Sequence, residues 1–153
     1  MKEGKHFKVS AIKNGTVIDH IPSKTVFKVI SILNLDKLED KMITFGSNFE
    51  SKKLGSKGII KISDKYFDRE DIDKISLIAP QAKISIIKDY EVVHKEVVEI
   101  PDKIVGIVKC INPNCISNHE KIQSKFLVLS KEDVSLKCHY CEKITSQTDL
   151  NLI

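Results

Sequence analysis

The four cysteines constrain the fold of this chain more than any other feature of its sequence. They form two close pairs, Cys110 with Cys115 and Cys138 with Cys141, and 22 residues separate the pairs. Two short cysteine turns joined by a longer excursion are typical of a structural zinc site, in which each turn supplies two of four tetrahedral ligands. The spacing therefore predicts a small zinc-bound module at the C-terminal end of the chain.

Disulfides or buried free thiols would also account for four cysteines. The N-terminal segment MKEGKHFKVSAIKN has neither the apolar stretch nor the cleavage site of a secretory signal. No run approaches the roughly 20 apolar residues that span a bilayer. We therefore expect a cytoplasmic chain with no membrane partner, and disulfides are rare in that compartment. His119 and His139 remain alternative metal ligands.

Four thiolates would leave no position open for water or substrate, so we expect one structural Zn²⁺ rather than a catalytic one. The segment that follows Ile100-Pro101-Asp102 has about 50 residues, which cannot easily bury a sufficient core. We expect the metal to supply much of the folding energy of this segment.

The first hundred residues alternate between two hydrophobic periods. Alternating apolar residues predict strands over 6–14 (extended through 16–21), 41–49, 59–62 and 83–93. Helical spacing predicts one helix over 26–33 and a second that begins after the N-cap Asp68 and ends near Pro80. A glycine- and lysine-rich loop is expected over 51–58.

The order strand, helix, strand, strand, helix, strand is that of the split βαβ, or ferredoxin-like, arrangement. Its antiparallel sheet carries helices on one face, and we expect a partner chain on the other. The predicted fold class is therefore α+β. A ferredoxin-like βαββαβ domain over residues 1–100 precedes a small all-β zinc-ribbon (rubredoxin-like) domain over residues 101–153.

The charge of the chain argues against a nucleic-acid partner. The net charge is +4 and Arg69 is the single arginine, whereas base recognition in DNA favours bidentate arginine. Residues 101–153 carry seven lysines and six acidic residues, and four thiolates with one Zn²⁺ would bring this segment to about −1. A nucleic-acid-binding zinc ribbon is thus the second hypothesis, and its binding would weaken steeply with salt.

Four polar residues of the first domain are expected to gather on one region of the sheet: Asp19, Lys57, Lys61 and Lys95. Side chains alternate along a strand with period 2, so Lys57 and Lys61 share a face. Lysines hold phosphates and a carboxylate accepts a hydrogen bond from a ribose hydroxyl, so the group suits a nucleotide. Alternatively, these lysines belong to the solvated surface of a lysine-rich chain.

Asp19 and His20 are adjacent in the run GTVIDHIPS and look like half of a catalytic dyad. In an extended strand they would point to opposite faces, so we do not expect them to act as an acid–base pair. The sequence contains no nucleophile elbow, zinc-protease motif or phosphate-binding glycine loop. We therefore predict no catalytic residues.

Five segments carry a resemblance to a known family: AIKNGTVIDHIP (11–22), LIAPQA (77–82), DYEVV (89–93), CINPNCISN (110–118) and LKCHYCEK (136–143). Through them the chain resembles, nearly end to end, the regulatory chain of aspartate carbamoyltransferase, an enzyme of pyrimidine synthesis. The resemblance implies a non-catalytic subunit that binds CTP, ATP and UTP as effectors, typically with CTP as inhibitor and ATP as activator. It also implies regulatory homodimers that bridge catalytic trimers, with the zinc domains holding the catalytic chains.

The same resemblance implies the positions of a nucleotide pocket: Val9, Ser10, Ala11, Ile12, Val17, Asp19, His20, Lys57, Ile59, Lys61, Ser85, Ile87, Tyr90, Val92 and Lys95. Lys95 and His20 would face the phosphates, and Lys61 and Asp19 would approach the ribose and the base edge. Ile12 and Tyr90 would frame the base. The apolar positions would otherwise be plain core. Ser10, Ser85 and His94 depart from the residues usual in the family, which leaves effector preference open.

The resemblance further implies that four residues of the zinc domain contact the catalytic chain: Asn112, Asn114, Glu142 and Lys143. The two asparagines would also suit the cysteine turn for purely local reasons. His139 stands where the family usually has lysine, so its contact would differ or respond to pH.

Overall fold

The computed structural model describes residues 11–52 and 55–153, and within them the chain forms two antiparallel sheets and two α-helices. The first sheet contains β1 (Gly15–Pro22), β2 (Ile43–Ser51), β3 (Gly55–Ser63), β4 (Lys83–Lys88) and β5 (Glu91–Val97). The helices are α2 (Val26–Ile32) and α3 (Arg69–Ile78). The second sheet contains β6 (Lys103–Val105), β7 (Lys125–Ser130), β8 (Ser135–Cys138) and β9 (Ile144–Ser146). Single-turn 3₁₀ helices lie at Ser23–Thr25, Leu35–Lys37, Ile116–Asn118 and Gln147–Asp149.

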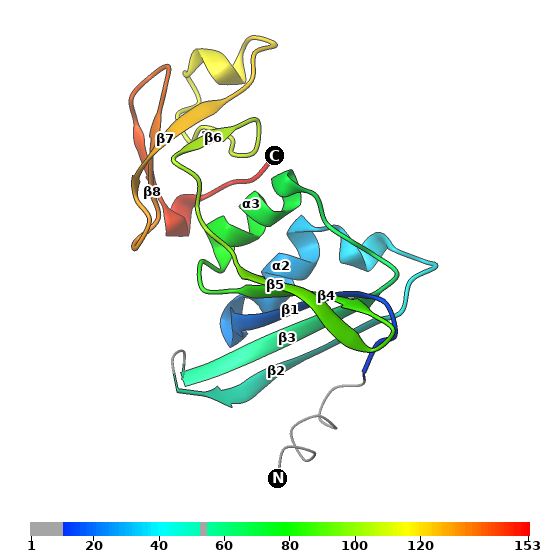
Figure 1. Cartoon of the computed structure of the whole chain (residues 1–153). Helices are drawn as coiled ribbons and strands as arrows, with labels where there is room; N and C mark the ends of the chain where they lie inside the picture. The colour runs from blue at the N-terminus through cyan, green and yellow to red at the C-terminus, as the bar shows by residue number, and fades with distance from the viewer. Residues whose placement is uncertain (1–10, 53–54) are drawn as a thin grey trace.

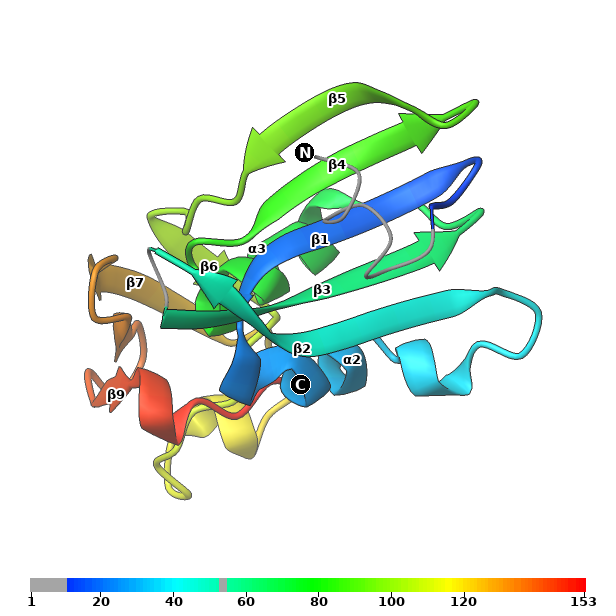
Figure 2. The ribbon, with the colours of Figure 1, turned by 90° about the horizontal axis from the view of Figure 1, so that it is seen from below.

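The strands of the first sheet lie in the order β2-β3-β1-β4-β5, and every neighbouring pair is antiparallel. Helices α2 and α3 cover one face of this sheet (Figure 1). Seen from below, the strands lie in front of the helices (Figure 2). The predicted α+β class and split βαβ order are confirmed, with one strand added at an edge. We call the face away from α2 and α3 the helix-free face.

The single strand predicted over 83–93 is two strands in the structure. The chain reverses at Asp89 and Tyr90, whose φ angles are 51° and 68°, so β4 and β5 form a hairpin with two turn residues. Two left-handed turn residues match the right-handed twist of the paired strands. The Asp-Tyr pair lacks the glycine that usually signals such a turn, which is why the prediction of one continuous strand is wrong.

Two other predicted boundaries are also wrong. Residues 55–58 belong to β3 rather than to a loop. Gly58 lies directly under α2, where any added side chain would collide with Val26. Residues 11–14 form no strand, and the earlier part of the strand predicted over 6–14 lies outside the described residues.

The main core lies between the first sheet and its two helices. Ile18, Ile60 and Ile62 from the sheet and Val29 and Ile75 from the helices are fully buried. Burying one such side chain contributes roughly 1.5–3 kcal/mol, so these contacts hold the helices on the sheet.

Helix α3 begins and ends where the sequence predicts. The Asp68 side chain accepts a hydrogen bond from the Asp71 N–H at 2.9 Å. A side-chain acceptor at the N-cap satisfies one of the N–H groups that the first helical turn leaves unpaired. The helix stops at Ile78, before Pro80.

The second sheet has the order β6-β7-β8-β9 and packs a core of its own. Ile104, Phe126 and Leu136 are buried there together with three of the cysteines, and Cys141 is partly buried against them. Leu77 of α3 belongs to the same core, and Gln147 Nε2 donates a hydrogen bond to the Leu77 carbonyl oxygen at 3.0 Å. The C-terminal segment ends beside the helices (Figure 1). The second sheet is therefore tied to the helix layer of the first.

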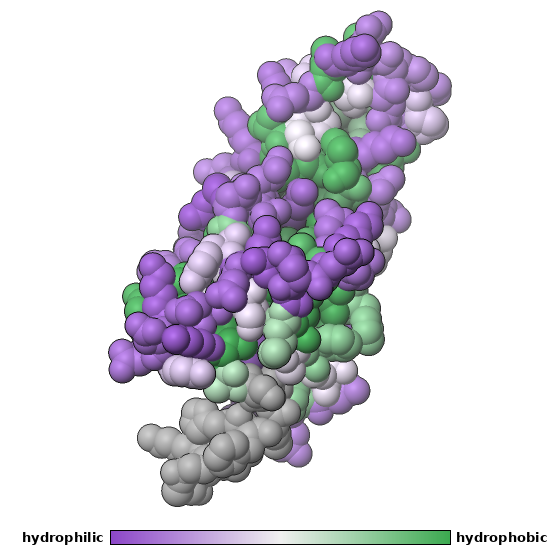
Figure 3. Space-filling view, turned by 90° about the vertical axis from the view of Figure 1, so that its right-hand side faces the viewer, coloured by the Kyte–Doolittle hydropathy of each residue, from purple (hydrophilic) through white to green (hydrophobic). Residues whose placement is uncertain are grey.

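Hydrophilic side chains cover most of the side shown in Figure 3, and hydrophobic side chains reach the surface in patches between them. Apolar side chains are exposed at both edges of the first sheet: Met42 just before β2, Phe45 on β2, and Val92 and Val97 on β5. Within the described ranges, no helix combines the length and the apolar character needed to cross a membrane.

Candidate functional site

The four cysteines form one cluster. Cys110 and Cys115 flank the turn before the third 3₁₀ helix, Cys138 ends β8, and Cys141 lies in the turn before β9. Their sulfur atoms all lie within 4.8 Å of one another, and the closest pairs are 3.6 Å and 3.7 Å apart. A zinc ion bound at ~2.3 Å by four tetrahedral sulfurs would hold them about 3.8 Å apart. The cluster therefore fits one tetrahedral metal ion.

Side-chain amides close the first cysteine turn. Asn118 Nδ2 donates hydrogen bonds to the carbonyl oxygens of Cys110 at 3.0 Å and Asn112 at 2.8 Å. Asn112 Oδ1 accepts a hydrogen bond from the Asn114 N–H at 3.0 Å. Of the two asparagines of the predicted partner contact, Asn112 thus stabilises the turn through its side chain, and Asn114 takes part through its backbone N–H.

Burial and hydrogen bonds shift the pKa values of Cys110, Cys138 and Cys141 in different directions. Burial raises the pKa of Cys110 to about 12 and also raises the pKa of Cys138. Burial pushes the pKa of Cys141 upward as well, but hydrogen bonds from the Lys143 N–H and the Asn112 side chain outweigh it and lower this pKa to about 6. Bringing Cys110 and Cys138 to the thiolate form therefore requires a positive charge close to them. A bound metal cation supplies that charge.

The two histidines considered as alternative ligands lie outside the cluster. His119 Nε2 is 2.8 Å from the Pro113 carbonyl oxygen, and the His139 ring packs edge-on against Tyr140. In the part of the chain that the structure describes, the sulfurs alone make up the group of clustered ligand atoms. The donor set is thus four sulfurs, which is typical of a structural site.

Strand register brings several predicted nucleotide residues into one row on the helix-free face. Lys61 of β3 pairs with Val17 of β1, and Val17 pairs with Ser85 of β4. Ser85 in turn pairs with Lys95 of β5. Directly paired residues share a face of the sheet. A continuous row therefore crosses four strands with a lysine at each end.

Further predicted residues lie beside this row. Lys57 and Ile59 alternate with buried residues along β3, so they share the face of Lys61. Ile87 of β4 pairs with Val92 of β5, one step along the strands from Ser85 and Lys95. The register thus collects side chains from β1, β3, β4 and β5 on one face.

Asp19 lies among the basic side chains of this face. Its carboxylate is 2.9 Å from Lys57 Nζ, and the residue pairs with Lys83 in the register of β1 and β4. Burial lowers the pKa of Lys61, and the charge of Asp19 offsets part of that effect. Lys83 was not among the predicted residues. Period-2 alternation along β4 from Ser85 is the signal that would have found it.

The Asp19–His20 pair does not follow the geometry of an extended strand. His20 has a φ of 59°, and the register with β3 shifts between Ile18 and Ile21, which marks a β-bulge. The His20 N–H donates to the Asp19 carboxylate at 2.6 Å, and Nδ1 lies 3.4 Å from Oδ2. The prediction that the two side chains point to opposite faces is wrong, because the bulge re-aims one of them. The 3.4 Å contact is longer than a good hydrogen bond.

The remaining predicted residues lie at the end of the face where β1 begins. Just before β1, Ala11 is exposed and Ile12 is buried. Tyr90 is 67% exposed in the hairpin turn, and its N–H donates to the Lys13 carbonyl oxygen at 2.9 Å. Val9 and Ser10 lie outside the described residues.

The fold and these two sites define a protein with a lysine-rich sheet face and a separate four-cysteine metal module. Two family models match the chain. Residues 7–99 match the allosteric domain of the aspartate carbamoyltransferase regulatory chain, and residues 102–151 match the metal binding domain of the same chain. The protein therefore belongs to the family of aspartate carbamoyltransferase regulatory chains, which are distinct from the catalytic chain of that enzyme.

Individual relatives match along nearly the whole length. A regulatory chain from Bacteroides fragilis is 51% identical over 154 residues, which is 100% of both chains. One from Thermococcus onnurineus is 52% identical and covers 94% of this chain and 95% of its own. One from Thermococcus sibiricus is 55% identical and covers 91% of each chain.

Proposed function

We propose that nucleoside triphosphates bind the helix-free face of this chain and thereby control aspartate carbamoyltransferase in pyrimidine biosynthesis. CTP inhibits, ATP activates and UTP is a further effector. The observation that carries the proposal is the row from Lys61 through Val17 and Ser85 to Lys95. It spans three strand spacings, or about 14 Å, which suits an elongated polyanion.

The chemistry of the face supports a nucleotide rather than a simple anion. Lys95 and His20 face the phosphates, which lysines hold as point charges. Lys61 and Asp19 approach the ribose and the base edge, where a carboxylate accepts a hydroxyl hydrogen bond. Tyr90 and Ile12 frame the base.

Control of the enzyme requires a physical link between the two modules. The proposed nucleotide domain comprises residues 1–100, and the proposed metal domain comprises residues 101–153. Leu77 of α3 lies in the core of the second sheet, and Gln147 bonds to its carbonyl oxygen. Effectors that bind unequally to two quaternary states shift the equilibrium between those states. The contacts of Leu77 and Gln147 then transmit the preference for one state to the metal domain.

The assembly we propose follows from the same features. The metal is one Zn²⁺, and Asn112, Asn114, Glu142 and Lys143 contact the catalytic chain. Nucleotide domains pair as homodimers, which bridge catalytic trimers, and the exposed apolar side chains at the sheet edges favour such pairing. Four free thiols gathered for a metal suit a reducing compartment, the cytoplasm.

Calorimetric titration of the folded, metal-loaded chain with CTP, ATP and UTP tests the effector site. Wild-type protein should bind, and Lys95→Ala should weaken binding by at least about tenfold because a phosphate contact is lost. The matched control Lys37→Ala removes an exposed lysine from the second 3₁₀ helix and should bind like wild type.

Failure of the folded wild-type chain to bind any of the three nucleotides would contradict the proposal. Tight DNA binding that collapses between two salt concentrations would instead favour a nucleic-acid-binding zinc ribbon.

A further inference from the structure

The outer face of the second sheet alternates lysines with aliphatic side chains. Lys103 of β6 pairs with Leu127 of β7, and Leu127 pairs with Lys137 of β8. Lys137 pairs in turn with Ile144 of β9, so one row crosses all four strands. In the next row, Val105 pairs with Lys125. Leu127 is therefore flanked by a lysine on each side.

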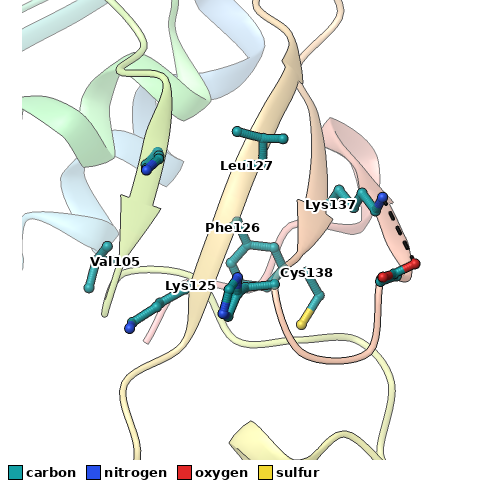
Figure 4. A pocket seen from close by; sticks show the side chains of 9 residues that line it. Val105, Lys125, Phe126, Leu127, Lys137 and Cys138 are labelled. Carbon is teal, nitrogen blue, oxygen red and sulfur yellow. Dashed lines mark ion pairs between the residues drawn. The ribbon is translucent and has the colours of Figure 1, made fainter.

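A surface groove of about 530 Å³ is lined by Lys103, Val105, Lys125, Leu127 and Lys137. Ile144 is the neighbour of Lys137 on β9. Figure 4 shows Leu127 on the central strand between Val105 on one neighbouring strand and Lys137 on the other. Val105 is 43% exposed, Leu127 47% and Ile144 56%. Aliphatic side chains left this exposed on one face of a sheet gain free energy when a partner covers them.

The groove has more positive than negative charge. Lys137 Nζ lies 3.9 Å from Glu142 Oε2, at the outer limit of an ion pair (dashed in Figure 4). Within residues 11–52 and 55–153, no carboxylate lies within ion-pair distance of Lys103 or Lys125. Diagonal neighbours in a sheet are about 7–8 Å apart, so these ammonium groups repel one another. Carboxylates from a partner would relieve that repulsion.

We propose that this groove binds an acidic, partly apolar segment of the catalytic chain. The proposal rests on the function proposed above. Carboxylates of the segment pair with Lys103, Lys125 and Lys137, and aliphatic side chains pack on Leu127. The contact thus continues from the cysteine turns, through Glu142 at the edge of the groove, across the whole outer face of the sheet.

Nucleic acid fits this groove less well than an acidic peptide. Phe126 lines it but is buried at 2% exposure, so it offers no ring for base stacking. The exposed aliphatic side chains of the groove would face phosphates and gain no free energy from burial. Apolar side chains of a peptide would instead cover them. Interfaces between proteins combine such an apolar centre with a charged rim.

The first test measures binding of the metal-loaded chain to the purified catalytic subunit. The double variant Lys103→Glu/Lys125→Glu should weaken binding by at least about tenfold and remove most of the salt dependence. Leu127→Asp should weaken it comparably, because it places a charge in the apolar centre. The matched control Lys37→Glu, an exposed lysine of the first domain, should bind like wild type. Metal content measured on each variant verifies that the module is folded.

The second test uses zero-length carbodiimide cross-linking of the wild-type complex, followed by mass spectrometry. Lys103, Lys125 or Lys137 should be joined to aspartate or glutamate of the catalytic chain. If the complex forms but shows no such cross-links and the variants bind normally, the groove proposal is wrong while the proposed function stands. Cross-links to a second copy of this chain, or competition by duplex DNA, would also overturn it. Failure of the wild-type chain to bind the catalytic subunit would reject the proposed function itself.

Discussion

At the scale of single residues, Asp19 is the carboxylate that contacts the basic side chains of the helix-free face. It pairs with Lys57 at 2.9 Å, contacts the His20 ring, and offsets part of the effect of burial on the pKa of Lys61. One carboxylate therefore serves several basic groups, which leaves the face able to accept a further negative charge. Burial of Lys61 makes its charged form costly until a counter-ion arrives.

Lys61→Met should weaken CTP binding and raise stability at neutral pH. Burial lowers the pKa of Lys61 in the folded state below its ordinary value of 10.5, so the unfolded chain holds this proton more tightly. The cost of charging Lys61 is then present in full below its folded pKa and is lost as pH rises toward 10.5. The variant should therefore gain stability over wild type at pH 7, and the gain should shrink at high pH. Urea unfolding at pH 7 and about 10 measures it.

The prediction for Lys61 has a matched control in Lys37→Met, which removes an exposed lysine and should leave stability unchanged at both pH values. A Lys61→Met protein that binds CTP like wild type would mean that this residue is not part of the effector site.

At the scale of elements, α2 approaches β3 closely at Gly58, which has no side chain. Gly58 pairs with Ile21 where β1 resumes its register after the bulge, and Val26 at the start of α2 lies on Gly58. The Gly46 carbonyl oxygen of β2 bounds the same space. A methyl group at this position therefore has no room.

Gly58→Ala should destabilise the chain by about 1–3 kcal/mol, because the added carbon displaces α2 or distorts the pairing of β2 with β3. Chemical denaturation of the full chain measures the change. Ser56→Ala, two residues earlier on the same strand, removes a hydroxyl group without adding volume, so it is the control and should have little effect. Equal stability of both variants would show that α2 does not pack closely on Gly58.

Sequence alone predicts the parts of this molecule that depend on short-range patterns. The spacing of the cysteines predicted their cluster, and apolar periodicity with Asp68 predicted α3. The bulge at His20 and the turn at Asp89 and Tyr90 were not predicted. Neighbouring strands impose left-handed backbone conformations there, and no local sequence motif indicates them. The groove on the second sheet also escaped, because the register between strands is what brings its lysines together.

At the scale of the whole molecule, the two sheets are joined by few but specific contacts. Leu77 of α3 lies in the core that contains the cysteines, and Leu152 packs against both cores. Packed side chains therefore connect the metal module to α3, and α3 lies on the sheet that carries the row from Lys61 to Lys95.

Removing the metal should unfold the second sheet and release the catalytic subunit, while CTP binding to the first sheet persists. Acid should act like a chelator, because protons compete with the metal for the sulfurs and metal affinity falls as pH falls. Metal content, size-exclusion chromatography and CTP titration of the treated chain check the three parts. A complex with the catalytic subunit that survives complete loss of metal would rule out the metal module as the tether.

The central claim is that this chain gives nucleotides control over a catalytic subunit that does not respond to them alone. Aspartate saturation curves, recorded for the purified catalytic subunit with and without this chain, test it most directly. In the complex, CTP should shift the curve to higher aspartate concentration and ATP should shift it to lower concentration, while the catalytic subunit alone should respond to neither. Identical curves with and without nucleotides in a verified complex would contradict the account.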